Sequence, residues 1–228
     1  MKTNVFKNYD PESVGDIVFA NANDRIRITE IVDGLRPFPQ SGKNGILLYG
    51  PSGTGKSALA KLLPDAMEMA LTGRPSNFKY IHVTQGSNGM NMLKEIQSQA
   101  ELISFLSFHF FVLDEVDNLT EQAMAILKSV MNMPQTIFIM TTNYRIKIDQ
   151  GVQDRCHAIP FLAAASQKWL PLAHRMLADA GITTISDQAL INVIDPCNGS
   201  ARQIVDALTT LILMAKRKSI TLPAMVTP

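Results

Sequence analysis

The octapeptide GPSGTGKS at residues 50–57 restricts the possible folds of this 228-residue chain more than any other feature. It matches the pattern G-x-x-x-x-G-K-[ST], follows the apolar run GILLYG, and precedes a stretch with apolar residues at helical spacing. Glycines let such a loop wrap a phosphate chain with inward-pointing N–H groups, and the following helix adds the positive end of its dipole. The octapeptide, called the P-loop below, predicts nucleotide binding, with Lys56 on the β- and γ-phosphates and Ser57 on Mg²⁺. The alternative is a glycine-rich turn that binds nothing, and the correct flanks on both sides argue against it.

Strands and helices alternate through the first 161 residues. Apolar runs predict strands at 45–50, 80–83, 110–113, 136–141 and 157–161. Helical spacing and caps predict helices at 24–32, 57–71, 91–102 and 121–133. Pro64 is expected to bend or interrupt the second of these helices. Continuously apolar strands that alternate with helices are typical of an α/β fold with a mostly parallel sheet covered on both faces.

The pattern changes after Phe161 to helices alone. Spacing, caps and stop signals predict three helices, at 166–180, 187–194 and 201–218. We therefore expect an α/β nucleotide-binding domain at 1–161, a small all-helical domain at 162–218 and a tail at 219–228.

Acidic and amide side chains follow two of the predicted strands. The run FFVLDEVD at 110–117 places Asp114 and Glu115 at the carboxyl edge of the sheet, where ligands bind in open α/β folds. With a P-loop upstream, Asp114 is expected to hold Mg²⁺ and Glu115 to polarise the attacking water, rather than to form a solvated acidic turn. Asn143, in TTNY at 141–144, is placed to reach the γ-phosphate or the lytic water, although asparagine after a strand is usually a turn former.

Composition excludes several classes of protein. A hydrophobic fraction of 46% excludes disorder as the dominant state, and a net charge of +1 excludes a strongly basic nucleic-acid-binding body. Two cysteines in a chain of this length favour a reducing cytoplasm. The longest apolar stretch, at 103–113, is interrupted by polar residues and falls short of the roughly 20 residues that a membrane span needs, so no membrane partner is expected. The N-terminus lacks the apolar run of a signal peptide.

Taken in order, the motifs resemble those of AAA+ ATPases, and within them the small subunits of replication-factor-C-type clamp loaders. NYDPESVGDIVF at 8–19 is similar to the family's N-terminal Y-R-P-x-x-x-x-D-I-V, and 113–132 is similar to its D-E-A-D stretch. TTNY, DRC at 154–156 and GSAR at 199–202 resemble sensor 1, the arginine-finger motif and sensor 2. Asp10, Ser129 and Asp154 depart from the family pattern. The helical domain corresponds to the family's lid, and the family's third, collar domain is expected to be absent.

The resemblance implies ATP and Mg²⁺ at the junctions of a head-to-tail oligomer of this chain or of related AAA+ subunits. It implies catalysis by Lys56, Asp114, Glu115 and Asn143 in cis, and by Arg155, which reaches the ATP of a neighbouring subunit. Ser57 and Asp114 are the expected metal ligands. The expected nucleotide-binding residues are Tyr9, Ile17, Val18, Gly50, Pro51, Ser52, Gly53, Thr54, Gly55, Lys56, Ser57, Ala58 and Arg202.

DNA is a further partner that the resemblance implies. QGSNGMNMLKEI at 85–96 is similar to the family's S-D-x-R-G-I segment, which contacts the duplex backbone with helix N-termini. The expected phosphate contacts are Ser87, Lys94 and Lys128, and a solvated helix face is an equally weighted alternative.

Two functions remain open at this point. The first is a clamp-loader-like ATPase of DNA replication or recombination. The second is an ATP-switched module with little turnover that holds a ring or filament on DNA or on a clamp, helicase, recombination or transposition partner. Glu115 argues against the second, because a pure switch does not need a residue that polarises water.

Overall fold

The computed structural model describes residues 9–86, 89–102 and 107–220, and these form two compact units. The α/β unit runs from Pro11 to Leu162. The helical unit contains the residues from Ala163 onward together with Tyr9 and Asp10. These two residues therefore group with the helical unit, although the sequence placed them in the α/β domain.

A parallel sheet of five strands forms the centre of the α/β unit, as the sequence predicts. The spatial order is β2-β3-β4-β1-β5. The strands are β1 (Gly45–Tyr49), β2 (Phe78–His82), β3 (His109–Asp114), β4 (Thr136–Thr142) and β5 (Cys156–Pro160). Because all paired neighbours are parallel, the carboxyl ends of the strands meet at one edge of the sheet and the amino ends at the other.

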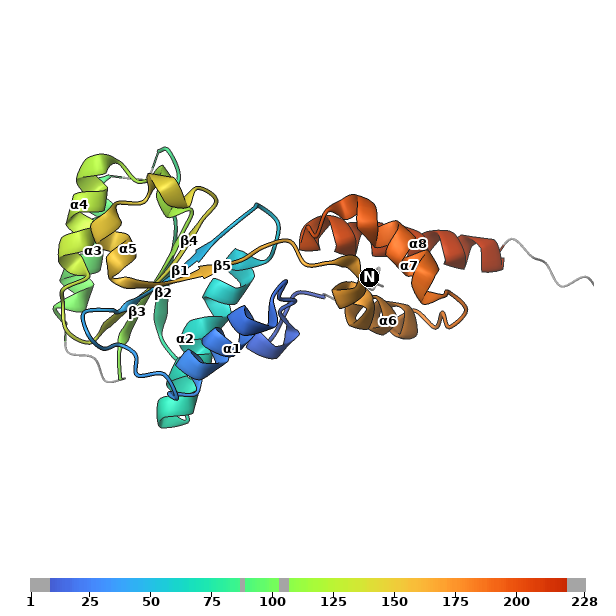
Figure 1. Cartoon of the computed structure of the whole chain (residues 1–228), viewed down its shortest axis with the longest axis horizontal. Helices are drawn as coiled ribbons and strands as arrows, with labels where there is room; N and C mark the ends of the chain where they lie inside the picture. Colours follow the sequence, from blue (N-terminus) through green and yellow to red (C-terminus); the bar gives the residue numbers. More distant parts are fainter. Residues whose placement is uncertain (1–8, 87–88, 103–106, 221–228) are drawn as a thin grey trace, which may run out of the picture. The chain divides into compact units, whose positions relative to one another are not determined.

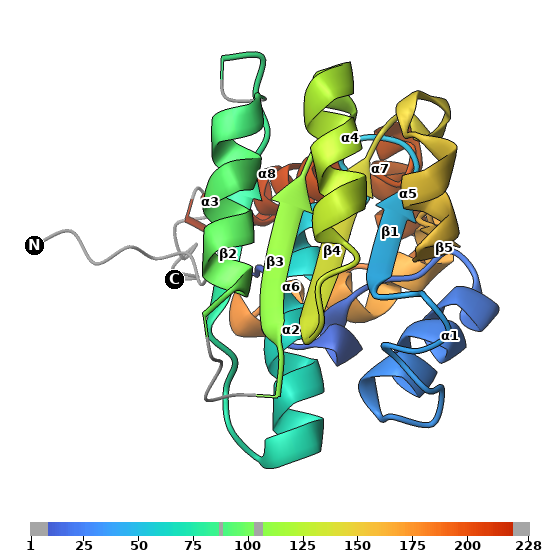
Figure 2. The same cartoon turned by 90° about the vertical axis from the view of Figure 1, so that its left-hand side faces the viewer.

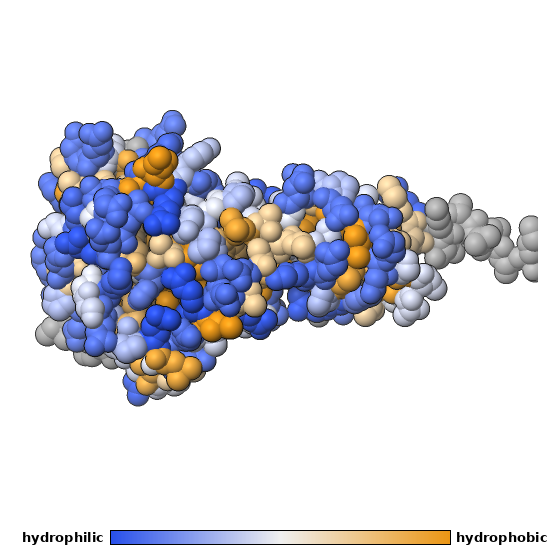
Figure 3. Space-filling view, in the orientation of Figure 1, coloured by the Kyte–Doolittle hydropathy of each residue, from blue (hydrophilic) through white to orange (hydrophobic). Residues whose placement is uncertain are grey.

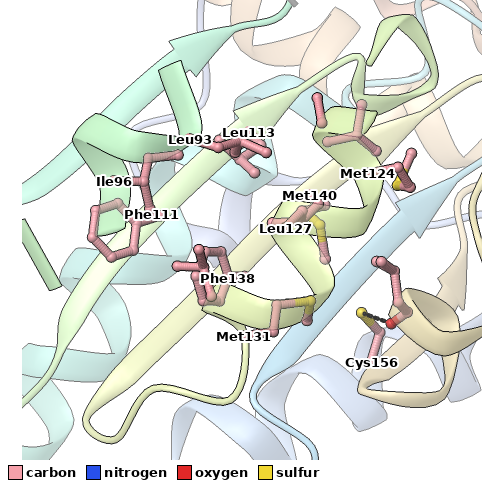
Figure 4. Packing of buried hydrophobic residues seen from close by; sticks show 14 of the residues in the cluster. Leu93, Ile96, Phe111, Leu113, Met124, Leu127, Met131, Phe138, Met140 and Cys156 are labelled. Atoms are coloured by element: carbon pink, nitrogen blue, oxygen red, sulfur yellow. Dashed lines mark hydrogen bonds between the residues drawn. The ribbon is translucent and has the colours of Figure 1, made fainter. Parts of the chain in front are cut away.

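Helices cover both faces of this sheet (Figure 2). One face carries α1 (Ala22–Val32) and α2 (Lys56–Thr72). The other carries α3 (Met90–Ala100), α4 (Glu121–Val130) and α5 (Gln150–Asp154). Each face has its own cluster of buried apolar side chains, and successive side chains along the strands belong alternately to one cluster and the other. Figure 4 shows the cluster under α3 and α4, where the rings of Phe111 and Phe138 stack with centroids 5.4 Å apart.

Helix boundaries follow from local chemistry. Thr120 caps α4, because its hydroxyl accepts a hydrogen bond from the Ala123 N–H at 3.2 Å. Pro64 was expected to bend or interrupt the helix after the P-loop, and the interruption is wrong, since α2 continues from Lys56 to Thr72. An internal proline costs about 3 kcal/mol, but burial of Leu59, Leu63 and Met67 on the same helix contributes more than this.

The described part of the helical unit is built mainly of α-helices (Figure 1). A short turn, η4 (Ser166–Trp169), leads into α6 (Leu170–Asp179), which is followed by α7 (Asp187–Ile194) and α8 (Ala201–Ile220). Ser186 caps α7, as the sequence predicts. The unit has its own small core, to which each of these elements contributes: Trp169, Leu177, Leu190, Ile204 and Leu208.

The surface is mainly hydrophilic in the view of Figure 3, and the hydrophobic spots are small and separate. Single exposed apolar side chains of this kind are normal on a protein surface. None of the helices in the described part of the chain is long and apolar enough to cross a membrane.

Candidate active site

The P-loop leaves the carboxyl end of β1 and enters α2 through three glycines with positive φ angles. Gly50 has a φ of 150°, and a Cβ atom there would lie 2.3 Å from the carbonyl oxygen of Phe161. Gly55, the N-cap of α2, has a φ of 104°. Only glycine fits the close approach at the first position and the backbone conformation at the second. Between them the Thr54 hydroxyl donates to the Pro51 carbonyl at 3.0 Å and closes the loop.

Lys56 occupies the centre of this loop. Its side chain is buried, and Nζ donates to the carbonyl oxygens of Gly50 and Pro51 at 2.8 and 2.6 Å. It also donates to Oδ1 of Asn143 at 2.9 Å. Burial lowers the pKa of Lys56, although the nearby carboxylates of the site act in the opposite direction. The ammonium therefore joins the P-loop to the carboxyl end of β4.

Asp114 is the centre of a second network at the same edge. Ser57 Oγ donates to its Oδ1 at 2.7 Å, Thr141 Oγ1 donates to the same oxygen, and the Tyr80 hydroxyl donates to Oδ2 at 2.8 Å. Burial raises the pKa of Asp114, but these three hydrogen bonds outweigh burial and leave the pKa below its ordinary value. The carboxylate is therefore ionised at neutral pH.

The side chains at this edge of the sheet suit the binding of a nucleotide with Mg²⁺. The Ser57 hydroxyl and the Asp114 carboxylate are oxygen ligands of the kind that Mg²⁺ takes, and they lie in contact with each other. The described residues contain no group of three or more His, Cys, Asp or Glu side chains that could hold a metal by themselves. Mg²⁺ commonly combines one or two protein ligands with phosphate oxygens and water. The buried ammonium of Lys56 and the N-terminus of α2 supply the complementary charge for phosphates.

Glu115 follows Asp114 in an unusual backbone conformation, with φ 60° and ψ 49°. This left-handed region is uncommon for a residue with a Cβ atom, and such residues cluster at functional sites. The backbone N–H of Glu115 donates to Thr141 Oγ1 at 3.0 Å, which holds the turn. The side chain is 41% exposed, with Oε2 3.9 Å from His82 Nε2. The carboxylate is therefore accessible to a water molecule at the carboxyl edge of the sheet.

Asn143 is positioned by Asp117. The Asp117 carboxylate accepts hydrogen bonds from the Thr142 hydroxyl at 2.7 Å and from the Asn143 N–H at 3.3 Å. The Asn143 side chain then accepts from Lys56. Three motifs separated in sequence therefore meet through direct hydrogen bonds.

Sequence reasoning missed several residues of this site. Tyr80 and His82 lie two positions apart on β2, so their side chains share one side of the strand. Tyr80 bonds to Asp114 at the end of β3, and His82 lies 3.7 Å from Asp114 and 3.9 Å from Glu115. Thr141 and Asp117 were within the motifs but had no assigned role. The alternation along β2 was readable, but the pairing of β2 with β3 was not.

Other expected nucleotide contacts have different surroundings. Ile17 is a buried member of the core cluster on the α1 and α2 face, and Val18 is half-buried. Tyr9 and Arg202 belong to the helical unit, where the Tyr9 hydroxyl donates to Asp179 Oδ2 at 3.2 Å and Arg202 is exposed in the first turn of α8. Their contact with nucleotide stays a prediction.

Arg155 lies between α5 and β5, at the amino edge of the sheet. Its Nε donates to Asn132 Oδ1 at 3.0 Å, and its Nη1 donates to the Gly151 carbonyl at 2.7 Å. The P-loop is at the opposite edge, beyond the whole length of β1, which pairs with β5 from Gly45 to Tyr49. A strand of five residues spans about 16 Å, so Arg155 is remote from its own P-loop.

The residues expected to contact DNA differ from one another. Lys94 is exposed on α3. Lys128 on α4 is already paired with Asp149, at 3.2 and 3.3 Å to the two carboxylate oxygens. Ser87 lies outside the described residues.

Comparisons with known proteins agree with this geometry. Residues 46–162 match the family described as ATPase family associated with various cellular activities (AAA). The chain is 28% identical over 222 residues to a replication factor C small subunit 2 from Pyrobaculum islandicum, and 29% identical over 209 residues to one from Pyrobaculum arsenaticum. These alignments cover 95% and 89% of this chain but 65% and 61% of the relatives, so the chain spans less than two thirds of their length.

Solved structures show the same fold at low sequence identity. PCH-2 from C. elegans has a TM-score of 0.56 and 14% identity, over 90% of this chain and 73% of its own. RuvB from Thermotoga maritima has a TM-score of 0.60 and 12% identity, over 89% of this chain and 73% of its own.

Proposed function

Because this chain belongs to the AAA family of ATPases, we propose that it hydrolyses Mg²⁺-ATP at the junctions of a head-to-tail assembly and acts in DNA replication in the manner of a clamp loader. The observation that carries this proposal is the direct contact between three separate motifs. Lys56 bonds to Asn143, and Ser57 bonds to Asp114, all at the carboxyl edge of one sheet.

Each residue of the site has one proposed task. The P-loop N–H groups, Lys56 and the start of α2 bind the phosphates, while Ser57 and Asp114 hold Mg²⁺. Bound Mg²⁺ would supply charge neutralisation on the phosphate oxygens. Glu115 orients the attacking water, and Asn143 is positioned by Asp117 to contact the γ-phosphate or that water. Tyr9, Ile17, Val18 and Arg202 are the further proposed contacts to the nucleotide.

Arg155 is the proposed arginine finger of the neighbouring site. Its position at the amino edge of the sheet, away from its own P-loop, supports a role in trans. A guanidinium is always charged, and its planar fork matches phosphate oxygens. Arginine fingers contribute rate factors of about 10³ or more, so isolated subunits should hydrolyse ATP slowly.

The replication role rests on the relatives. Proteins named replication factor C small subunits match across most of this chain, and DNA with a sliding clamp is therefore the proposed target. A helicase or a recombination protein is the alternative partner. Lys94, which is exposed on α3, is the better candidate for a phosphate contact, because Lys128 is ion-paired.

Two variants test the chemistry of the site. Lys56→Ala should abolish ATP binding, because the phosphates lose their buried cation. Glu115→Gln should keep ATP binding and lose turnover, with Glu95→Gln, which removes an exposed carboxylate on α3, as the control. Calorimetry measures binding, and phosphate release measures turnover. Wild-type turnover by Glu115→Gln would refute the assigned role.

Mixing variants tests the role in trans. Arg155→Ala should bind ATP but not hydrolyse it when alone. Mixed with Lys56→Ala, it should regain activity at junctions where its intact P-loop meets an intact Arg155. Full activity of Arg155→Ala alone, or no gain on mixing, would refute a finger. Stimulation of ATPase activity by primed DNA, measured against protein concentration, tests the proposed target.

A further inference from the structure

Residues 43–45, at the start of β1, form hydrogen bonds to the backbone of Arg155 and of the residues on either side of it. Lys43 Nζ donates to the carbonyl oxygens of Asp154 and Cys156, at 2.7 and 3.1 Å. The backbone N–H groups of Asn44 and Gly45 both donate to the carbonyl oxygen of Arg155, at 3.1 and 3.0 Å. Three consecutive carbonyls therefore all accept hydrogen bonds from residues 43–45.

Lys43 is itself held in place. It ends a tight turn in which Lys43 and Gln40 exchange two backbone hydrogen bonds, at 2.9 and 3.0 Å. The next residue, Asn44, is buried, and its Nδ2 donates to the carbonyls of Met131 and Thr136 at 2.8 and 3.1 Å. The backbone that carries the Lys43 side chain is therefore held by hydrogen bonds on both sides of this residue.

The Lys43 ammonium bonds to the backbone, which is unusual for a lysine near the surface. Lysine on a surface normally extends into water, where its charge is best solvated. Here the ammonium instead bonds to the two backbone carbonyls on either side of Arg155 in the chain. A hydrogen bond from a charged donor to a carbonyl is among the stronger ones in proteins, and it offsets the loss of water from around the ammonium.

We propose that Lys43 is a positioning residue for Arg155, which fixes the backbone from which the guanidinium reaches the ATP of the neighbouring subunit. The inference rests on the proposed role of Arg155 in trans. The Arg155 side chain is held separately, by Asn132 and Gly151. The hydrogen bonds from residues 43–45 restrict the backbone, and these two contacts restrict the guanidinium. Misplacement of a catalytic group by a fraction of an ångström to one ångström is enough to reduce a rate strongly.

The variant Lys43→Met removes the ammonium and keeps the aliphatic stem. We expect kcat to fall about tenfold, the size expected when a charged hydrogen bond in the support of a catalytic group is lost, while the affinity for ATP stays unchanged. Lys43→Arg keeps a cationic donor and should retain most of the activity. Lys79→Met is the matched control. Lys79 also forms a polar contact, an ion pair with Glu95 of α3, but it lies on β2, the end strand of the sheet farthest from β5.

Complementation separates positioning from a general structural defect. Lys43→Met should regain activity when mixed with Lys56→Ala, whose Arg155 is intact. It should gain nothing when mixed with Arg155→Ala, because both partners then lack a well-placed finger. A merely structural role predicts no such pattern. Should Lys43→Met unfold, Lys43→Gln, which keeps one amide donor, replaces it in both mixtures.

Three results would overturn the proposal. They are wild-type kcat in Lys43→Met, a loss of activity in Lys43→Arg equal to that in Lys43→Met, and rescue by Arg155→Ala instead of by Lys56→Ala. Failure here is distinguishable from failure of the proposed function. If only the role of Lys43 is wrong, Arg155→Ala and Lys56→Ala still complement each other. If the role of Arg155 in trans is wrong, they do not.

Discussion

Gly45, the first residue of β1, has no room for a side chain. A Cβ atom there would lie 2.5 Å from Cys156 Sγ, 2.8 Å from Met131 Cε and 3.3 Å from the Arg155 carbonyl oxygen. Cys156 cannot easily move, because it is buried on β5 and its thiol donates to the Val152 carbonyl at 3.0 Å. Figure 4 shows this sulfur and its hydrogen bond beside Met131.

The variant Gly45→Ala should therefore lower the free energy of unfolding by about 2 kcal/mol, which lies within the usual cost of overpacking a core. With a urea m-value of about 2 kcal/mol/M, the midpoint should fall by about 1 M. Cys156→Ala removes the closest atom and should itself cost about 1 kcal/mol. The double variant should then cost about 1 kcal/mol less than the sum of the two, because the two sites are in contact.

Far-UV circular dichroism in urea is the appropriate assay. Trp169, the only tryptophan, lies in the helical unit, so its fluorescence would not follow β1. Gly73→Ala is the control. Gly73 has a φ of 69° with nothing within 4 Å of its Cβ position, so alanine costs about 1 kcal/mol there through backbone strain alone. That cost should add to the cost of Cys156→Ala. An effect of Gly45→Ala below about 0.5 kcal/mol, or simple additivity with Cys156→Ala, would refute the steric argument.

Three other properties can be tested in the same protein. Lys94→Ala should weaken DNA binding and reduce the slope of log affinity against log salt concentration by about one. Lys128→Ala should have a smaller effect, because Lys128 is paired with Asp149. Equal effects of the two variants in filter binding would contradict this. Burial, together with the nearby charges of Lys43, Arg36 and Arg27, lowers the pKa of His157. The folded state therefore binds fewer protons than the unfolded state, and the free energy of unfolding falls as the pH drops below about 6.5. His157→Gln should flatten this part of the plot of urea midpoint against pH. Burial raises the pKa of Cys156 to about 12, so alkylation of the folded protein at pH 8, followed by mass spectrometry, should be about 10³-fold slower than that of an ordinary thiol.

The sequence was most informative where one residue type serves one physical need. Glycines at 50 and 55 predicted a loop that wraps phosphates, and in the structure both residues have positive φ angles. Continuous apolar runs predicted the parallel sheet, which is confirmed. The motifs at Asp114 and Asn143 were expected at strand ends, and the structure joins them to the P-loop through Ser57 and Lys56.

Other features depended on information that a sequence pattern does not contain. Tyr80 and His82 meet the acids only because β2 lies beside β3, and strand order is a property of the whole fold. The helix α5 has five residues, too few for a periodic pattern to show. Pro64 was misjudged because its cost within α2 is offset by burial elsewhere on the same helix.

The left-handed backbone of Glu115 also has an evolutionary consequence. A residue with a Cβ atom costs about 1–2 kcal/mol in this conformation, and glycine or asparagine would relieve much of that cost. Selection for thermal stability alone would therefore favour replacing this residue. Such a selection would remove the carboxylate proposed to orient water, so a library enriched only for melting temperature should accumulate stable proteins that bind ATP without turning it over.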